Sequence, residues 1–372
     1  MEEAKVYYTD LRTAPGNTLL DKLGRLLREA GIGNINFKNK FTAIKIHFGE
    51  PGNMSFLRPN YAKVVADTVK ELGGRPFLTD CNTLYVGGRK DALEHIDSAY
   101  TNGFTPFSTG CHVIIADGLK GSSQTLVPVE GGTYVREAKI GEAIMDADIV
   151  ISLTHFKGHE NTGFGGALKN LGMGCGSRAG KMEMHSAGKP HVSTKRCIGC
   201  RKCTTVCAHS AITVTDKKAR IDHSRCVGCG RCLALCPADA IRAASDESND
   251  VLNCKIAEYT KAVVAHRPHF HVSLVIDVSP YCDCHEENDA AIVPDVGFFA
   301  SFDPVALDVA CADAVNAQPP IYTNTKLTDS HVHEHEGEDY FRVMHPETNW
   351  QVCMEHAEML GIGMRKYQLI RV

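Results

Sequence analysis

Eight cysteines between residues 197 and 236 form two runs of identical spacing, and no other feature restricts the fold of this chain as strongly. Each run reads C-x2-C-x2-C-x3-C, the spacing of bacterial-type ferredoxins, in which the fourth cysteine of each run ligates the other cluster. The first run is Cys197, Cys200, Cys203 and Cys207, and the second is Cys226, Cys229, Cys232 and Cys236. The repeat predicts two 4Fe–4S clusters.

The two clusters are expected to exchange their final ligands. One would be held by Cys197, Cys200, Cys203 and Cys236, and the other by Cys226, Cys229, Cys232 and Cys207. Pro237 ends the second run, whereas Ala208 takes the corresponding place in the first run, which removes no ligand. Two zinc knuckles are the alternative, but zinc sites pair their cysteines with a longer gap between the pairs.

The cysteine runs interrupt a longer pattern of alternating strands and helices. Strands are predicted at 5–9, 42–48, 76–80, 112–116, 148–154, 270–278 and near 296–300. Helices are predicted at 18–30 (with Asn17 as N-cap), 60–72, 89–100, 140–147, 251–265, 304–315 and 350–360. Repeated strand–helix units predict an α/β fold, with a mostly parallel sheet and helices on both faces. These patterns divide the whole chain into three predicted segments: the first part of a host domain over 1–188, an inserted α+β ferredoxin-like domain over 189–245, and the second part of the host domain over 246–372.

Composition narrows the class of protein. The 372 residues are 43% hydrophobic and 23% charged with a net charge of −4, which gives no reason to expect nucleic-acid binding. No signal peptide precedes the first strand and no apolar run could span a bilayer, so we expect a cytoplasmic protein without a membrane partner. Sixteen cysteines are unusual for such a chain and point to metal in a reducing, anaerobic cell rather than to disulfides.

Several motifs outside the insert carry a family resemblance. They are KIHFGEPGN (45–53), RPNY (58–61), LTDCNTLYVG (78–87), the long segment 155–185, SPYCDC (279–284), IVPDVG (292–297) and SFDPVALD (301–308). Together they resemble the uncharacterised iron–sulfur centre proteins of the domain-of-unknown-function family numbered 362, over nearly the whole chain with the ferredoxin insert. The resemblance implies iron–sulfur binding and leaves the reaction open.

Polar residues gather after the apolar strand 148–154, at the sheet edge where ligands of α/β proteins bind. The candidate catalytic residues are His155, Lys157, His159, Lys169 and Asn170. The candidate cofactor-binding residues are Gly163, Gly165 and Gly166, which we expect to open a short helix, and His47 at the same edge. Free N–H groups at that helix start would favour a small anion, and a histidine would move protons or bind metal. Alternatively, these groups only tie the loop down by hydrogen bonds.

A second group of cysteines predicts a third metal or cluster site. Cys282 and Cys284 flank Asp283, and two thiolates can share a soft metal, with Cys175 and His185 as further ligands. Buried thiols without metal are the alternative. The other cysteines are expected to be packing residues: Cys81, Cys111, Cys254, Cys311 and Cys353. Asp303, before Pro304, is expected as a helix N-cap rather than a catalytic group, and His331, His333 and His335 as a solvated loop rather than a metal site.

The sequence thus favours an oxidoreductase that passes electrons from a donor or acceptor protein, through two 4Fe–4S clusters, to a small anionic ligand at 155–170. The alternatives are a ferredoxin-type electron carrier without catalysis, and a non-redox metal-dependent enzyme with structural clusters. No G-x-G-x-x-G follows the first strand, so a nicotinamide is not indicated, while a flavin stays open. The oligomeric state is not predicted.

Overall fold

The computed structural model describes residues 3–85, 87–185, 189–243, 248–329 and 339–372, built around an eight-stranded sheet of order β16-β1-β15-β14-β7-β2-β3-β4. The strands are β1 (Ala4–Asp10), β2 (Phe41–Lys45), β3 (Arg75–Asp80), β4 (Val113–Ile115), β7 (Ile149–His155), β14 (His269–Val275), β15 (Gly297–Ser301) and β16 (Tyr367–Arg371). Neighbours pair in parallel except at β15, which is antiparallel to β14 and to β1. The predicted α/β class with a mostly parallel sheet is confirmed.

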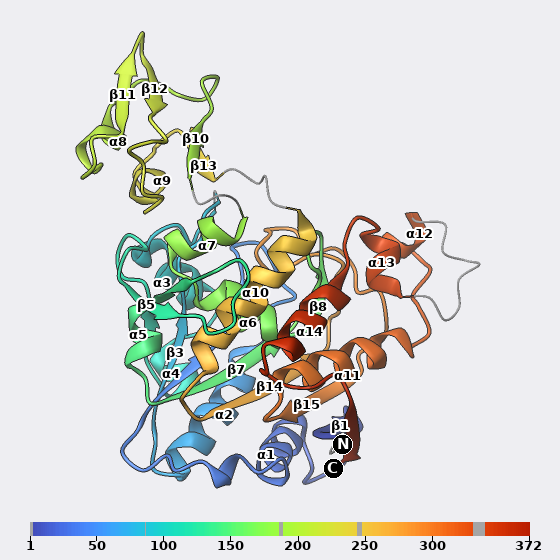
Figure 1. Cartoon of the computed structure of the whole chain (residues 1–372). Helices are drawn as coiled ribbons and strands as arrows, with labels where there is room; N and C mark the ends of the chain where they lie inside the picture. Colours follow the sequence, from blue (N-terminus) through green and yellow to red (C-terminus); the bar gives the residue numbers. More distant parts are fainter. Residues whose placement is uncertain (1–2, 86, 186–188, 244–247, 330–338) are drawn as a thin grey trace.

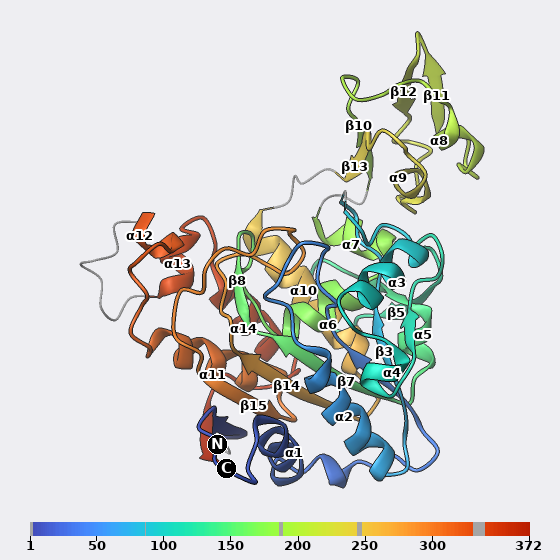
Figure 2. The same cartoon turned by 180° about the vertical axis from the view of Figure 1, so that it is seen from behind.

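Helices cover both faces of the sheet because alternate side chains of the strands point to opposite sides. In β7, Ile149 and Ile151 join one apolar core, whereas Val150 joins the other. The first face carries α1 (Leu19–Glu29), α2 (Pro59–Glu71), α3 (Ala92–Thr101) and α4 (Pro106–Thr109). The second carries α5 (Glu142–Asp146), α6 (Ala167–Cys175), α10 (Asn249–Val264), α11 (Pro304–Asn316) and α14 (Trp350–Met359), and Figures 1 and 2 show the two layers from opposite sides.

The helix starts test the capping predictions. Asp303 accepts hydrogen bonds from the N–H groups of Val305 and Ala306, so its role as N-cap of α11 is confirmed. The N-cap of α1 is Thr18 and not Asn17, because Thr18 forms a reciprocal capping box with Asp21.

Some elements differ from the prediction. The predicted helix 140–147 starts later, since Glu137–Gly141 forms β6, which pairs with β5 (Gln124–Pro128). A hairpin of β8 (Lys157–His159) and β9 (Gly163–Gly165) precedes α6. The short elements η1 (Ile32–Asn34), α12 (Lys326–Asp329) and α13 (Tyr340–Met344) complete the host. His331, His333 and His335 lie outside the described residues. None of the described helices is long and apolar enough to cross a membrane.

The cysteine-rich segment forms a small lobe that stands apart from the large sheet (Figure 1). Its elements are β10 (Pro190–Val192), α8 (Lys202–Thr205), β11 (Ile212–Thr215), β12 (Lys218–Ile221), α9 (Arg231–Ala234) and β13 (Ile241–Ala243). β10 pairs with β13, and the hairpin β11–β12 points away from the host (Figures 1 and 2). On the host side, Leu84 and Met182, the latter on α7 (Arg178–His185), join the apolar core of the lobe, and Lys90 pairs with Asp239.

Candidate functional site

Four cysteines of the lobe line one small cavity. They are Cys197, Cys200, Cys203 and Cys236, three from the first run and the last cysteine of the second run. The rest of the lining is mainly apolar and includes Ile198, Val214 and Ile241. The chain therefore brings together the four thiols that the spacing assigns to one cluster.

The sulfur atoms of the lobe also accept backbone hydrogen bonds in a repeated pattern. The N–H of Ala211 donates to Sγ of Cys207, and the N–H of Ala240 donates to Sγ of Cys236, both at 3.2 Å and both from four residues further on. The N–H of Ala219 donates to Sγ of Cys197 at 3.3 Å. Such bonds stabilise thiolates, and they are one of the features that set the reduction potential of a cluster.

A cavity of about 550 Å³ opens in the host between α6, α7 and the loop that carries Cys284. A smaller cavity of about 60 Å³ lies deeper and shares Lys169, Lys181 and Cys284 with the first. The inner cavity has a strong surplus of positive charge. Five Lys and Arg side chains line it together with His47, against one carboxylate and the acidic thiol of Cys282: Lys45, Arg89, Lys157, Lys169, Lys181 and Asp80.

Three of these cations pair with buried carboxylates: Lys45 with Asp80 at 3.0 Å, Arg89 with Glu50 at 2.7 Å, and Lys157 with Asp283 at 3.4 Å. Burial is the largest single influence on Asp80 and raises its pKa, but the combined charges of Lys45, His95, His47 and Lys181 lower it by more, and the net pKa is lowered. Lys181 donates to two backbone carbonyls instead. Nη2 of the buried Arg89 has no hydrogen-bond partner among the described residues. The inner cavity is thus lined by this guanidinium nitrogen and by several ammonium groups.

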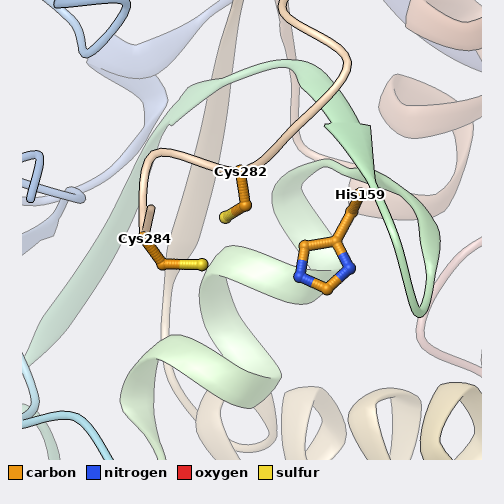
Figure 3. Close-up of side chains that lie close together, drawn as sticks. All are labelled: His159, Cys282 and Cys284. Atoms are coloured by element: carbon orange, nitrogen blue, oxygen red, sulfur yellow. The ribbon is translucent and has the colours of Figure 1, made fainter. Parts of the chain in front are cut away.

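His159, Cys282 and Cys284 converge beside these cavities, with one ligand atom of each lying within 4.8 Å of the others. Figure 3 shows the two sulfur atoms and the imidazole facing the same space, above the helix α6. Nδ1 of His159 accepts the N–H groups of Asn161 at 3.0 Å and Thr162 at 3.3 Å, so Nε2 is the nitrogen that faces the sulfur atoms.

The two cysteines of this group differ in charge. The thiol of Cys284 donates a hydrogen bond to Cys282, and this bond, with the ammonium groups of Lys169 and Lys157, lowers the pKa of Cys282 well below its usual range. Nζ of Lys169 lies 3.3 Å from Sγ of Cys282. The same hydrogen bond and burial raise the pKa of Cys284. Of the two thiols, Cys282 is therefore the more acidic.

His155 and Lys157 hold the cysteine loop in place. Nδ1 of His155 lies 2.8 Å from the Asp283 carboxylate, and Nε2 lies 2.8 Å from the carbonyl oxygen of Ile276. Lys157 lies 3.4 Å from the other oxygen of Asp283. Burial raises the pKa of Asp283, but the positive charges of His155 and Lys157 lower it by more. Since both nitrogens of the buried His155 are used, it has no free atom to offer a ligand.

The start of α6 does not have the free N–H groups that the glycine run was expected to provide. Gly163 and Gly165 lie in β9, and Gly166 is the N-cap. The carboxylate of Asp308, from α11, accepts the N–H groups of Ala167 at 2.6 Å and Leu168 at 2.9 Å. The helix start is already occupied, so an anion has to bind elsewhere.

The other predicted residues are divided between the cavities and the core. Asn170 lines the inner cavity, and its side chain accepts from Lys45 at 2.8 Å. His47 also lines it, with a pKa that burial lowers. His185 lines the outer cavity, where burial lowers its pKa to about 4.

Cys175 lies apart from Cys282 and Cys284. Its backbone carbonyl accepts from the thiol of Cys81, and burial raises its own pKa to about 12. His159, and not the expected Cys175, is therefore the side chain that converges with Cys282 and Cys284. The five cysteines expected as packing residues are all buried: Cys81, Cys111, Cys254, Cys311 and Cys353.

Sequence reasoning missed Lys45, Arg89 and Lys181. All three lie in or next to the motifs that carry the family resemblance, at 45–53, 78–87 and 155–185. A buried position for a charged residue is uncommon without a partner or a ligand, but a single sequence does not reveal burial.

A comparison with protein families shows which family the chain belongs to. The model described as domain of unknown function (DUF362) matches residues 42–313, which is most of the chain. The chain belongs to this family. A curated relative, the thylakoid-associated protein sll1697 of Synechocystis sp. (strain ATCC 27184 / PCC 6803 / Kazusa), is 28% identical over 167 residues. That match covers 42% of this chain and 44% of the relative, so the chain matches less than half the length of this relative.

Solved structures give only distant likeness. A structural-genomics crystal structure of a Thermotoga maritima protein has a TM-score of 0.42 at 12% identity, over 80% of this chain and 58% of that chain. The lactate racemase apoprotein from Thermoanaerobacterium thermosaccharolyticum has a TM-score of 0.41 at 11% identity, over 99% of this chain and 83% of that chain. No functional argument rests on scores of this size.

Proposed function

We propose that this DUF362 protein is an iron–sulfur redox protein, in which a ferredoxin-like insert over 189–245 holds two 4Fe–4S clusters and delivers electrons to the host cavities. The observation that carries the proposal is the cavity lined by Cys197, Cys200, Cys203 and Cys236. Only exchanged ligation, as in two-cluster ferredoxins, requires Cys236 beside the first run.

Contacts between the insert and the host support a route for electrons between the second cluster and the host cavities. Cys232, a ligand of the second cluster, is close enough to Arg178 to shift its pKa, although burial is the larger influence and lowers it. Arg178 starts α7, Met182 of the same helix packs in the core of the insert, and Lys181 lines both cavities. Helix α7 therefore lies between the second cluster and the ligand.

The cavities favour a small ligand with an anionic end. The surplus of cations and the unpartnered Nη2 of Arg89 suit a carboxylate or phosphate in the inner cavity, with the ligand body in the outer one. Lys169 and His159 lie along the outer cavity, where they would supply the protons that accompany electron transfer to the ligand.

Anaerobic purification tests the proposal. Iron analysis is expected to give about eight iron atoms per chain, and dithionite-reduced protein a coupled 4Fe–4S electron paramagnetic resonance signal. Zinc in place of iron would refute the cluster assignment. Reoxidation of the reduced protein is then followed with inorganic phosphate and short-chain carboxylates, in the wild type and in Lys181→Ala, with the exposed Lys63→Ala as control. If neither the added ligands nor the Lys181→Ala substitution changes the reoxidation rate, the result favours an electron carrier without catalysis.

A second candidate function is a third metal site at His159, Cys282 and Cys284, favoured by their convergence. The two thiolates and Nε2 of His159 would supply three ligands for zinc or iron, and a fourth position would face the outer cavity. Because Nδ1 already accepts two backbone N–H groups, metal at Nε2 would displace the ring proton. Metal analysis of Cys284→Ser tests the site: loss of one metal per chain with the eight iron atoms retained supports it, and unchanged metal content refutes it.

A further inference from the structure

The insert carries a charge opposite to that of its host. Residues 189–245 contain eleven Lys and Arg against three Asp and Glu, a surplus of eight. The whole chain has a net charge of −4, which leaves −12 for the host. A strongly basic lobe on an acidic body concentrates an attractive potential for acidic partners at one end of the molecule.

Most of these cations are available to a partner. Eight of the eleven side chains are exposed: Lys195, Arg196, Arg201, Lys202, Lys217, Arg220, Arg225 and Arg231. In the part of the chain that the structure describes, none of the eight takes part in a salt bridge. The Asp239 carboxylate of the insert pairs instead with Lys90 of the host.

The charges are densest around the first cysteine run. Lys195 and Arg196 precede Cys197, and Arg201 and Lys202 follow the exposed Cys200. Between the two cysteines, Ile198 is 63% exposed and also lines the cavity of the first cluster. An exposed apolar side chain thus lies at the cluster site, between pairs of exposed cations that precede and follow it along the chain.

This loop lies at the far end of the insert. A Cβ on Gly199 would lie 2.6 Å from the carbonyl oxygen of Lys217, so the loop packs on the turn between β11 and β12. Figures 1 and 2 show that this hairpin points away from the host. The second run lies nearer the host, since Gly230 packs against Arg178.

We propose that the surface of Ile198, Lys195, Arg196, Arg201 and Lys202 is the docking site of an acidic electron-carrier protein, which exchanges electrons with the first cluster. The inference rests on the proposed function. The cations steer an acidic carrier to this end while the acidic host repels it elsewhere, and Ile198 gives an apolar contact at the cavity whose four cysteines would hold the cluster. Electrons then pass to the second cluster and on to the host.

Electron exchange between the full-length holoprotein and an acidic [2Fe–2S] ferredoxin tests the proposal, in whichever direction transfer is spontaneous. The variant is Arg196→Glu/Lys202→Glu, and the control is Lys38→Glu/Lys366→Glu on the host. At about 0.01 M salt the variant is expected to lower the second-order rate constant about tenfold or more, while the control stays within about twofold. Near 1 M salt the difference should disappear, because the Debye length falls to about 3 Å.

Other readouts separate the possible failures. Reduction by methyl viologen and the cluster resonance signal should be the same in wild type and variant; if clusters are absent from the wild type, the proposed function itself fails. Clusters that are present but exchange electrons equally fast in variant and wild type overturn the docking site alone. Tight retention on single-stranded nucleic acid or anionic vesicles, with an electron-exchange rate that the Glu substitutions do not change, would assign the basic surface to another partner. That result would also overturn the docking site.

Discussion

Replacement of Asp308 tests how the cavity-forming helix α6 is held. Asp308 is fully buried and accepts the N–H groups of Ala167 and Leu168, which no N-cap side chain serves because the N-cap is Gly166. A buried N–H left without a partner costs about 1–3 kcal/mol. Asp308→Ala leaves two such groups but also removes a buried carboxyl, so we expect a loss of about 2–4 kcal/mol. Asp308→Asn keeps one acceptor and should lose about 1 kcal/mol near pH 5.

The pH dependence gives a second, independent test. Burial raises the pKa of Asp308 from 3.8 to about 7. The folded protein therefore holds a proton that the unfolded chain releases, and the stability linked to this group is fully present below about pH 4 and lost as pH rises towards 7. About three pKa units correspond to roughly 4 kcal/mol. Asp308→Asn lacks this titration, so its deficit relative to wild type should shrink or reverse between pH 5 and pH 8.

Urea unfolding provides the measurement, because Trp350 is the single tryptophan and packs on Phe164 just before α6, with ring centroids 5.1 Å apart. Its fluorescence reports unfolding of this region directly. Asp313→Asn, on the exposed side of α11, is the matched control and should change stability by less than about 1 kcal/mol. A deficit of Asp308→Asn that is equal at pH 5 and pH 8 would refute the reasoning.

Three further changes probe the ligands and the loop that holds them. Cys236→Ala should lower iron from about eight to about four atoms per chain, whereas the buried Cys311→Ala should keep all of it; full retention in Cys236→Ala would exclude exchanged ligation. Elemental analysis should show that Cys282→Ser loses a third metal and that Cys175→Ser keeps it. Loss of this metal in Cys175→Ser but not in Cys282→Ser would instead support Cys175 as the ligand. Asp283→Asn should cost about 3–5 kcal/mol in chemical denaturation, since it leaves a buried ammonium unpaired. Because the folded pKa of Asp283 is lowered, this stabilisation is present above about pH 4 and lost in acid, so wild type and variant should converge there; a constant gap would contradict the ion pair.

The features that sequence predicted well are local ones. The strand β7 begins with three apolar residues and is buried at every position, as parallel strands covered on both faces are. The Asp303-Pro304 pair marks the start of α11 through contacts within three residues. The cysteine spacing likewise placed Cys236 with the first run, because the repeat itself carries the pairing.

The features that sequence missed depend on distant contacts. Nothing near Gly166 indicates that a carboxylate more than 140 residues away caps α6. The sequence predicted that Cys282 and Cys284 belong together, but their neighbour His159 depends on the β8–β9 hairpin, which turns it towards them. Cys175, in the same motif, lies at the end of α6 and faces the core.

The pairing of β10 with β13 has a consequence for how such a chain can be built. Pro190 lies opposite Ala243, so the polypeptide leaves the large domain and returns to it at neighbouring points. A short glycine-rich link across these points would close the gap without stretching either end, and the large domain should then fold as a continuous unit. In this sense the cysteine-rich lobe is an inserted domain that recombination could add or remove without changing the connections between the strands of the host sheet.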